Sequence, residues 1–226
     1  MNQFCCWSVA IVLALGGSWL SASEPAKLST VEAVPAAISQ KIQAELNPKG
    51  QRVQIGDRPV CTIWLLKEIP FKSDFKPTLA VKYPLVAGQL IAVMEVAPNS
   101  EFTDFRGQEI SAGFYTLRYG QQPVDGNHVG TSELSDFLLA CPARLDEDPA
   151  GPKDLPSIFK LSAKATGSNH PAIFSLLPPK PGDKSPALIE DSSKEQWIFT
   201  VSPGGKSGDK TLPLPLRLIV IGRSEG

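Results

Sequence analysis

Residues 108–120, QEISAGFYTLRYG, decide the fold of this chain. Side chains from residue 114 onward alternate between two faces: Tyr115, Leu117 and Tyr119 on one, Phe114, Thr116 and Arg118 on the other. A repeat of two is typical of a β-strand with one face buried. Ala112 and Gly113 supply a bend before it. The stretch therefore predicts a half-buried strand.

Further strand-like runs lie on both sides of this stretch. The segment GQLIAVMEVA, residues 88–97, is almost wholly apolar, as expected of a strand at the centre of a sheet. Runs rich in β-branched and aromatic residues predict more strands at 51–55, 59–66, 135–143, 171–178, 195–201 and 214–222. Between the last two, residues 202–211 have the composition of a flexible hairpin loop.

Two short helices are expected beside the strands. Ile38, Ile42 and Leu46 recur at helical spacing within residues 35–47. Residues 155–165 form the second, with Asp154 as its N-terminal cap and Gly167 as its end. Helical segments this short can only cover the edge of a larger structure.

The order of these segments predicts the fold class. Strands follow strands without a regular β-α-β rhythm, which favours antiparallel pairing. The chain holds 21 prolines, and proline breaks helix interiors but is tolerated in turns and at sheet edges. We expect an all-β protein, a mainly antiparallel β-sandwich of about eight strands with one or two short peripheral helices. A single domain would span residues 48–226, preceded by an N-terminal segment at 24–47 whose first part, 24–34, is loose.

The first 23 residues contain no Asp, Glu, Lys or Arg. An apolar run at 9–15 is followed by the helix-breaking Gly16 and Gly17 and by the small residues 21–23, an order typical of a cleaved signal peptide. A retained anchor is the alternative, although the apolar run is short against the roughly 20 residues of a full span. The pattern predicts an exported protein, periplasmic or extracellular, without a stable transmembrane span after cleavage.

The charge balance bears on the class of partner, and the cysteines bear on whether the chain holds a disulfide. Lys and Arg total 22 against 23 Asp and Glu, and this balance argues against nucleic acid as a partner. Cys61 and Cys141 are the two cysteines beyond the signal segment, and in an exported protein such a pair suggests a disulfide. The alternative is two buried free thiols that pack as small apolar groups.

The loop at residues 120–136 holds the most distinctive polar chemistry. Asp125 and Gly126 predict a turn, Asn127 and His128 follow, and Asp136 is expected to hold the base of the loop through backbone amides. The second histidine, His170, also follows an asparagine in a predicted loop. Asp125, Asn127, His128 and His170 are therefore the candidate binding residues.

A metal ion is the one cofactor that these residues suggest. If the two loops met, His128, His170 and Asp125 would form a three-ligand metal site with an open position. Their spacing matches no known metal motif, and a surface histidine beside a turn needs no ligand. The sequence therefore predicts no cofactor, with a metal ion as the alternative.

The segment from "QEISAGFYTLRYG" through "QPVDGNHVGTSELSDFLLACPA" resembles uncharacterised exported bacterial proteins of unknown function with predicted β-sandwich folds. The resemblance is centred on residues 108–143. It implies export and a sandwich fold, and it carries no catalytic residues.

Three functions follow from the sequence. The first is an exported, non-enzymatic binding or interaction module whose partner is a protein or another component of the cell envelope. The second is a metal-dependent hydrolase that uses His128, His170 and Asp125. The third is a carbohydrate-binding module, which requires exposed aromatic side chains such as Phe102 or Phe105 on a rim of the sandwich.

Overall fold

The computed structural model describes residues 24–122 and 135–224, which form thirteen strands, two α-helices and one short 3-10 helix. The large sheet has seven strands in the order β1 (Ala26–Val31), β2 (Gly50–Ile55), β3 (Arg58–Leu65), β5 (Leu90–Val96), β6 (Gly113–Gln121), β7 (Asp136–Pro142) and β8 (Ala172–Ser175). The small sheet has the order β13 (Leu216–Ile221), β10 (Gln196–Val201) and β9 (Ala187–Asp191). All pairings in both sheets are antiparallel, so the predicted all-β, sandwich-like fold is confirmed.

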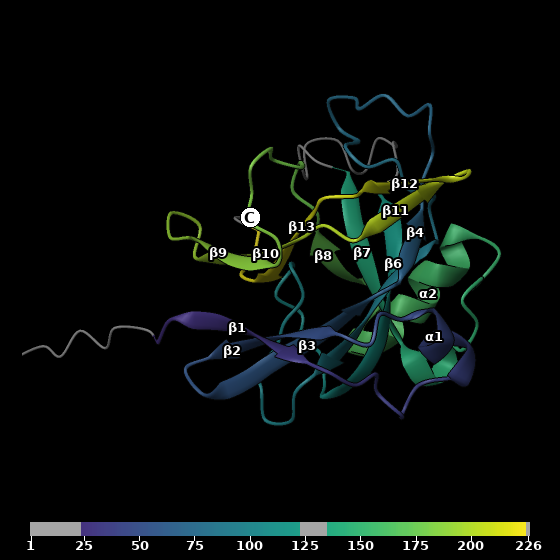
Figure 1. Ribbon diagram of the computed structural model, residues 1–226. Helices are drawn as coiled ribbons and strands as arrows, with labels where there is room; N and C mark the ends of the chain where they lie inside the picture. The colour runs from purple at the N-terminus through teal and green to yellow at the C-terminus, as the bar shows by residue number, and fades with distance from the viewer. Residues whose placement is uncertain (1–23, 123–134, 225–226) are drawn as a thin grey trace, which may run out of the picture.

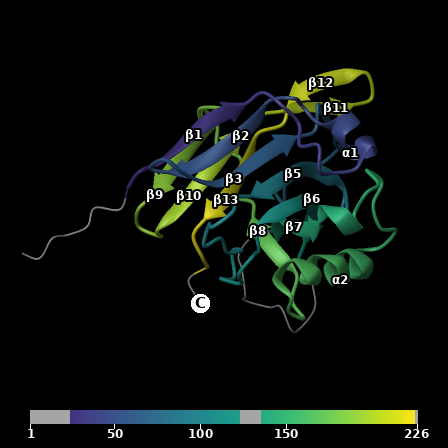
Figure 2. The ribbon, with the colours of Figure 1, turned by 90° about the horizontal axis from the view of Figure 1, so that it is seen from below.

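The two sheets face each other across the main apolar core (Figures 1 and 2). Leu117 of β6, Leu138 of β7 and Phe199 of β10 meet in its centre around a void of about 10 Å³. On one side the sheets are joined by an isolated bridge between Leu176 and Leu218. On the other side their edge strands β1 and β9 lie in contact. Burial between the sheets therefore drives the fold, as the alternation of β6 predicts.

The outer face of the large sheet is covered as well. The helix α2 (Leu155–Thr166) packs against β7 and β8, where Ile158 contacts Leu139 and Cys141. The Asp154 carboxylate accepts the amide of Ser157 at 2.8 Å, and the helix ends at Gly167, both as predicted. The shorter α1 (Gln40–Glu45) buries Ile42 in the main core.

A third sheet, in the order β12 (Lys210–Pro213), β11 (Gly204–Ser207) and β4 (Glu68–Pro70), lies at one end of the sandwich (Figure 1). Its β4–β11 pairing is parallel and joins segments far apart in the chain. The hairpin loop expected at residues 202–211 does join two paired strands, β10 and β13, but it is not the irregular loop that its composition predicts. Its glycine-rich segment forms strands β11 and β12, which pair with each other, and β11 also pairs with β4.

The N-terminal segment also differs from its prediction. Residues 24–34, expected to be loose, contain β1, which pairs with β2 along its whole length from Ala26 to Val31. The backbone groups at the edge of β2 supply hydrogen-bond partners for this strand. That pairing joins segments apart in the sequence, so local composition does not predict it. Among the described residues, no helix has the length and apolar character needed to cross a membrane.

Candidate functional site

The predicted histidine site falls largely outside the described residues. Asp125, Asn127 and His128 lie in residues 123–134, which the structure does not describe. His170 is exposed after the end of α2, where its amide donates to the Ser168 hydroxyl at 3.0 Å. Within residues 24–122 and 135–224, no cluster of three His, Cys, Asp or Glu side chains could hold a metal ion. The metal site stays a prediction.

Cys61 and Cys141 are free and buried, so the disulfide is not formed and the alternative of two buried thiols is correct. The two cysteines lie on β3 and β7, and β5 and β6 separate these strands in the large sheet. Neighbouring strands in a sheet are about 4.8 Å apart, so three such spacings separate β3 from β7. A disulfide cannot span that distance. Burial raises the pKa of each thiol to about 12, which keeps both protonated and unreactive.

Of the two aromatic side chains expected on a sugar-binding rim, one is buried and the other is half-buried. Phe102 is buried, and its ring stacks on Phe174 at a centroid distance of 5.7 Å. Phe105 is half-buried, and its amide donates to the Ile173 carbonyl at 2.8 Å. None of the aromatic residues that the structure describes is fully exposed.

Arg118 shows that the outer face of β6 is buried, not half-solvated as its alternation predicts. Its guanidinium pairs with the Asp146 carboxylate at 2.6 Å through Nε and 2.9 Å through Nη2. The remaining N–H groups donate to the carbonyls of Gly88, Asp148 and Pro149. The Thr116 hydroxyl donates to the same carboxylate. Every donor of the guanidinium is used within the chain, so this pair holds the loop after β7 in place.

Asp136 has a similar structural role at the start of β7. Its carboxylate accepts the Tyr119 hydroxyl and, at 2.6 Å, the backbone amide of Lys82. The amide belongs to Lys82 and not to the loop at residues 120–136, so this bond fastens the segment between β4 and β5. That Asp136 also holds the base of the loop through backbone amides stays a prediction, because residues 123–134 lie outside the described part of the chain. Burial raises the pKa of Asp136, and burial together with the carboxylate raises the pKa of Tyr119.

That fastened segment builds the wall of an open groove, which we call the Tyr83 groove. Both ends of the segment are tied down: the Phe71 amide donates to the Lys206 carbonyl of β11 at 2.9 Å, and Gln89 donates from Nε2 to the Pro70 carbonyl at 2.7 Å. Gly205 of β11 admits the Phe71 ring, because a Cβ at this position would lie 2.8 Å from Phe71 Cδ1. The groove thus depends on contacts between β4, β11 and β5.

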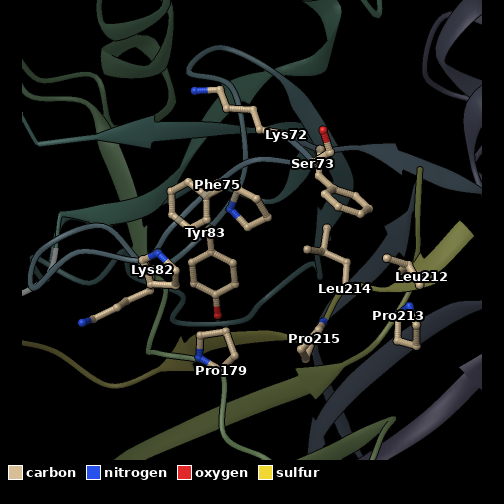
Figure 3. Close-up of a pocket in the computed structure, with 13 residues that line it drawn as sticks. Lys72, Ser73, Phe75, Lys82, Tyr83, Pro179, Leu212, Pro213, Leu214 and Pro215 are labelled. Atoms are coloured by element: carbon tan, nitrogen blue, oxygen red, sulfur yellow. The ribbon is translucent and has the colours of Figure 1, made fainter. Parts of the chain in front are cut away.

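The groove has a volume of about 300 Å³ and a mainly apolar lining (Figure 3). Its lining consists of Phe71, Lys72, Ser73, Phe75, Pro77, Lys82, Tyr83, Pro84, Pro179, Leu212, Pro213, Leu214 and Pro215. Tyr83 lies in the middle, with Phe75 and Leu214 on either side, and the Lys72 and Lys82 ammonium groups lie at the margin (Figure 3). Phenylalanine, leucine and proline side chains supply apolar contact area, and the two lysines supply charge.

The floor of the groove is held by the Tyr83 hydroxyl, which donates to the Leu177 carbonyl at 2.6 Å and accepts the Arg217 amide at 3.2 Å. These bonds join the segment after β4 to the end of β8 and the start of β13. Burial raises the pKa of Tyr83, so the hydroxyl stays protonated as the donor. A rigid floor of this kind pre-organises a binding surface.

A second cavity, the Arg217 hollow, lies next to the groove and has a volume of about 250 Å³. Its lining runs through residues 179–185, 200–202 and 215–217, so that Pro179 and Pro215 belong to both cavities. Arg217 Nε lies 2.8 Å from Asp183 Oδ2, and Arg217 Nη1 donates to the Pro178 carbonyl at 3.0 Å. Four charged side chains line this hollow, against two in the groove beside it.

Sequence reasoning missed both cavities. Their residues come from four segments: 71–84, 179–185 and 212–217, which the sequence marks only as proline-rich runs with scattered lysines, and 200–202 at the end of β10. The proline content was an available signal, because stiff loops form lasting walls. Comparison with protein families, with curated proteins and with solved structures finds no match.

Proposed function

We propose that this protein is an exported, non-enzymatic β-sandwich that binds a protein or another component of the cell envelope through the Tyr83 groove. The observation that carries the proposal is the groove itself, a concave surface with two phenylalanines, two leucines and five prolines around a buried tyrosine. Concave, mainly apolar surfaces with a few polar groups at fixed positions are typical of binding sites.

The exposed apolar side chains in and near the groove support this role. Leu212 lines the groove with half of its surface exposed, 50%. Phe71 and Phe75 are half-buried beside it. A partner that covers Leu212 would gain about 1 kcal/mol from that side chain alone, taken as half of a full leucine burial. A binding module needs several such contacts around one centre.

The buried polar groups support binding over catalysis. The Asp146 and Asp136 carboxylates accept hydrogen bonds from their own chain, and the Arg118 donors are all used there. These groups stabilise the loops that surround the sandwich. The groove brings apolar surface to the solvent, and it is this surface that a partner would cover.

Binding is tested on an affinity matrix with two serine variants, one at a leucine of the groove and one at a valine outside it. Leu212→Ser removes apolar area from the groove, and Val86→Ser removes it from a residue of equal exposure, 51%, outside the lining. An envelope extract of the source cells is passed over the wild-type protein and both variants, and retained components are then purified and titrated. We expect a component that binds the wild-type protein and Val86→Ser and loses about fivefold in affinity with Leu212→Ser. Equal binding to all three proteins contradicts the groove as the site.

Export is tested separately by cell fractionation. The proposal rests on the uncharged first 23 residues and on the small residues at 21–23. We expect the protein outside the cytoplasm with its N-terminal residue near position 24. A cytoplasmic protein that retains Met1 contradicts export and leaves the groove result unaffected.

A further inference from the structure

The groove and the hollow are neighbours with a shared wall. Pro179 and Pro215 line both cavities, so an occupant of the Tyr83 groove that extends past these two prolines enters the Arg217 hollow. The first cavity offers aromatic and leucine side chains, and the second offers a guanidinium. Together they accept an elongated occupant with an apolar part and a charged part.

The charged side chains of the combined lining indicate whether the occupant carries positive or negative charge. Its basic residues are Lys72, Lys82, Lys180, Lys184 and Arg217, and its one acidic residue is Asp183. The whole chain, by contrast, carries a formal net charge of −1. Basic side chains are therefore concentrated at these two cavities, and the resulting potential attracts an anionic segment.

The Arg217–Asp183 contact points to a carboxylate. The charged atoms lie 2.8 Å apart, and the two side chains are only 16% and 18% exposed. Yet Arg217 Nε and Asp183 Oδ2, both buried, lack the geometry of a hydrogen bond. A guanidinium prefers two parallel hydrogen bonds to one carboxylate, and Asp183 does not provide them. An incoming carboxylate with free orientation can bind Arg217 better than Asp183 does.

The occupant would bind through its side chains and not as an added strand. The Leu214 amide points toward β11, where it donates to the Pro203 carbonyl. Backbone groups alternate in direction along a strand, so the backbone nitrogens of Pro213 and Pro215 point to the opposite, outer edge. Proline has no N–H, and these two residues therefore remove donors from the edge that an added strand would need.

We infer that the Tyr83 groove and the Arg217 hollow form one site for an extended acidic peptide segment of a partner protein. Its apolar side chain enters the groove, and its Asp or Glu carboxylate replaces Asp183 at Arg217. This inference rests on the proposed function and names the class of partner. Asp183 is then an internal competitor that the peptide displaces.

A displayed library of random peptides, selected on the purified protein, tests the inference. We expect enriched sequences with acidic residues next to an aromatic residue or leucine. A fluorescent peptide with the enriched sequence is then titrated, and its affinity should fall as salt rises from about 0.05 to about 0.5 M because the lining is basic. Enriched peptides without acidic residues would overturn the inference.

Three variants locate the carboxylate with the same peptide. Asp183→Asn removes the competitor and should tighten binding several-fold, while Asp74→Asn, an equal change of charge at an exposed residue outside the lining, should not. Lys180→Gln with Lys184→Gln, at two exposed residues, should weaken binding about tenfold without disturbing the fold. An equal gain from Asp183→Asn and Asp74→Asn would show a general charge effect and overturn the role of Asp183.

Two outcomes separate this inference from the proposed function. If an envelope component is lost with Leu212→Ser but no acidic peptide is selected, the groove is a binding site and the acidic peptide is wrong. If dextran sulfate competes for the site and acidic peptides do not, the occupant is an anionic polysaccharide and the inference falls. If acidic peptides bind equally to the wild-type protein and Leu212→Ser, both the groove and the inference fall.

Discussion

Arg118 and Asp146 show how single residues fix the loops of this protein. Arg118 lies on the outer face of β6, and the chain returns after β7 to place Asp146 against it. Gly151 makes this return close enough, because its φ of +67° suits glycine and a Cβ there would lie 2.4 Å from the guanidinium. One ion pair and three carbonyls thus replace the water that Arg118 loses on burial.

Asp146→Ala is expected to lower the free energy of unfolding by about 3–5 kcal/mol, because it leaves a buried guanidinium without its counter-charge. Urea unfolding followed by circular dichroism measures the change. The control is Lys206→Ala, which breaks the exposed Lys206–Glu68 pair and should cost no more than about 1 kcal/mol. Similar losses for both variants would mean that Arg118 finds other partners.

Asp136 should give the stability of the protein a pH dependence. Burial raises its native pKa above the ordinary value of 3.8, so the folded state binds more protons than the unfolded state between these two values. The free energy of unfolding therefore falls as pH rises through that window. In Asp136→Asn the side chain does not titrate, so this contribution to the pH dependence is absent.

Urea unfolding of both proteins at a series of pH values tests this expectation. The stability of the wild-type protein minus that of Asp136→Asn should decrease from pH 3.8 upward and become constant above the native pKa. A difference that increases with pH would show that the hydrogen bonds from Tyr119 and Lys82 lower the pKa more than burial raises it.

At the scale of elements, the free edge of β8 is covered by the turn at residues 102–110. The Asp104 carboxylate accepts the Ile173 amide at 3.1 Å and the Arg106 and Gln108 amides at 3.0 and 2.8 Å. The Phe105 amide donates to the Ile173 carbonyl on the same edge. A turn thus takes the place of an eighth strand and blocks pairing with another chain.

Asp104→Ala should expose this edge. We expect a loss of about 2–4 kcal/mol in the free energy of unfolding, since buried amides lose a charged acceptor. Hydrogen exchange should accelerate at the Ile173 and Gln108 amides and stay unchanged in β2. Glu101→Ala, at an exposed residue of the same connection, is the control and should leave exchange at Ile173 as it is.

At the scale of the whole molecule, the two facing sheets share one apolar core and should unfold together. Phe199 of the small sheet is 1% exposed and contacts the residues of the large sheet around the central void. The bridge from Leu176 to Leu218 and the contact of β1 with β9 join the sheets at both edges. Neither sheet can bury its inner face without the other.

Phe199→Ala is therefore expected to cost about 3–5 kcal/mol and to weaken both sheets at once. Trp64 lies in the large sheet and Trp197 in the small sheet, and the other two tryptophans, Trp7 and Trp19, lie in the first 23 residues. In the protein that starts at residue 24, fluorescence after Trp64→Phe or Trp197→Phe therefore follows each sheet separately. Unfolding curves from both reporters should shift to the same lower urea midpoint. A shift confined to the Trp197 signal would mean that the small sheet unfolds independently.

The sequence by itself determined the β-class, the antiparallel order and the central strands, because alternation and apolar runs are local properties of residues 88–97 and 114–119. It also placed α2 between Asp154 and Gly167, since caps act within a few residues. Tertiary structure alone decided the rest. The pairing of β1 with β2, the parallel contact of β4 with β11 and the burial of Arg118 against Asp146 join segments that the chain brings together only when folded. The Tyr83 groove belongs to the same class, because its walls come from three distant segments and no local pattern encodes a shape made between them.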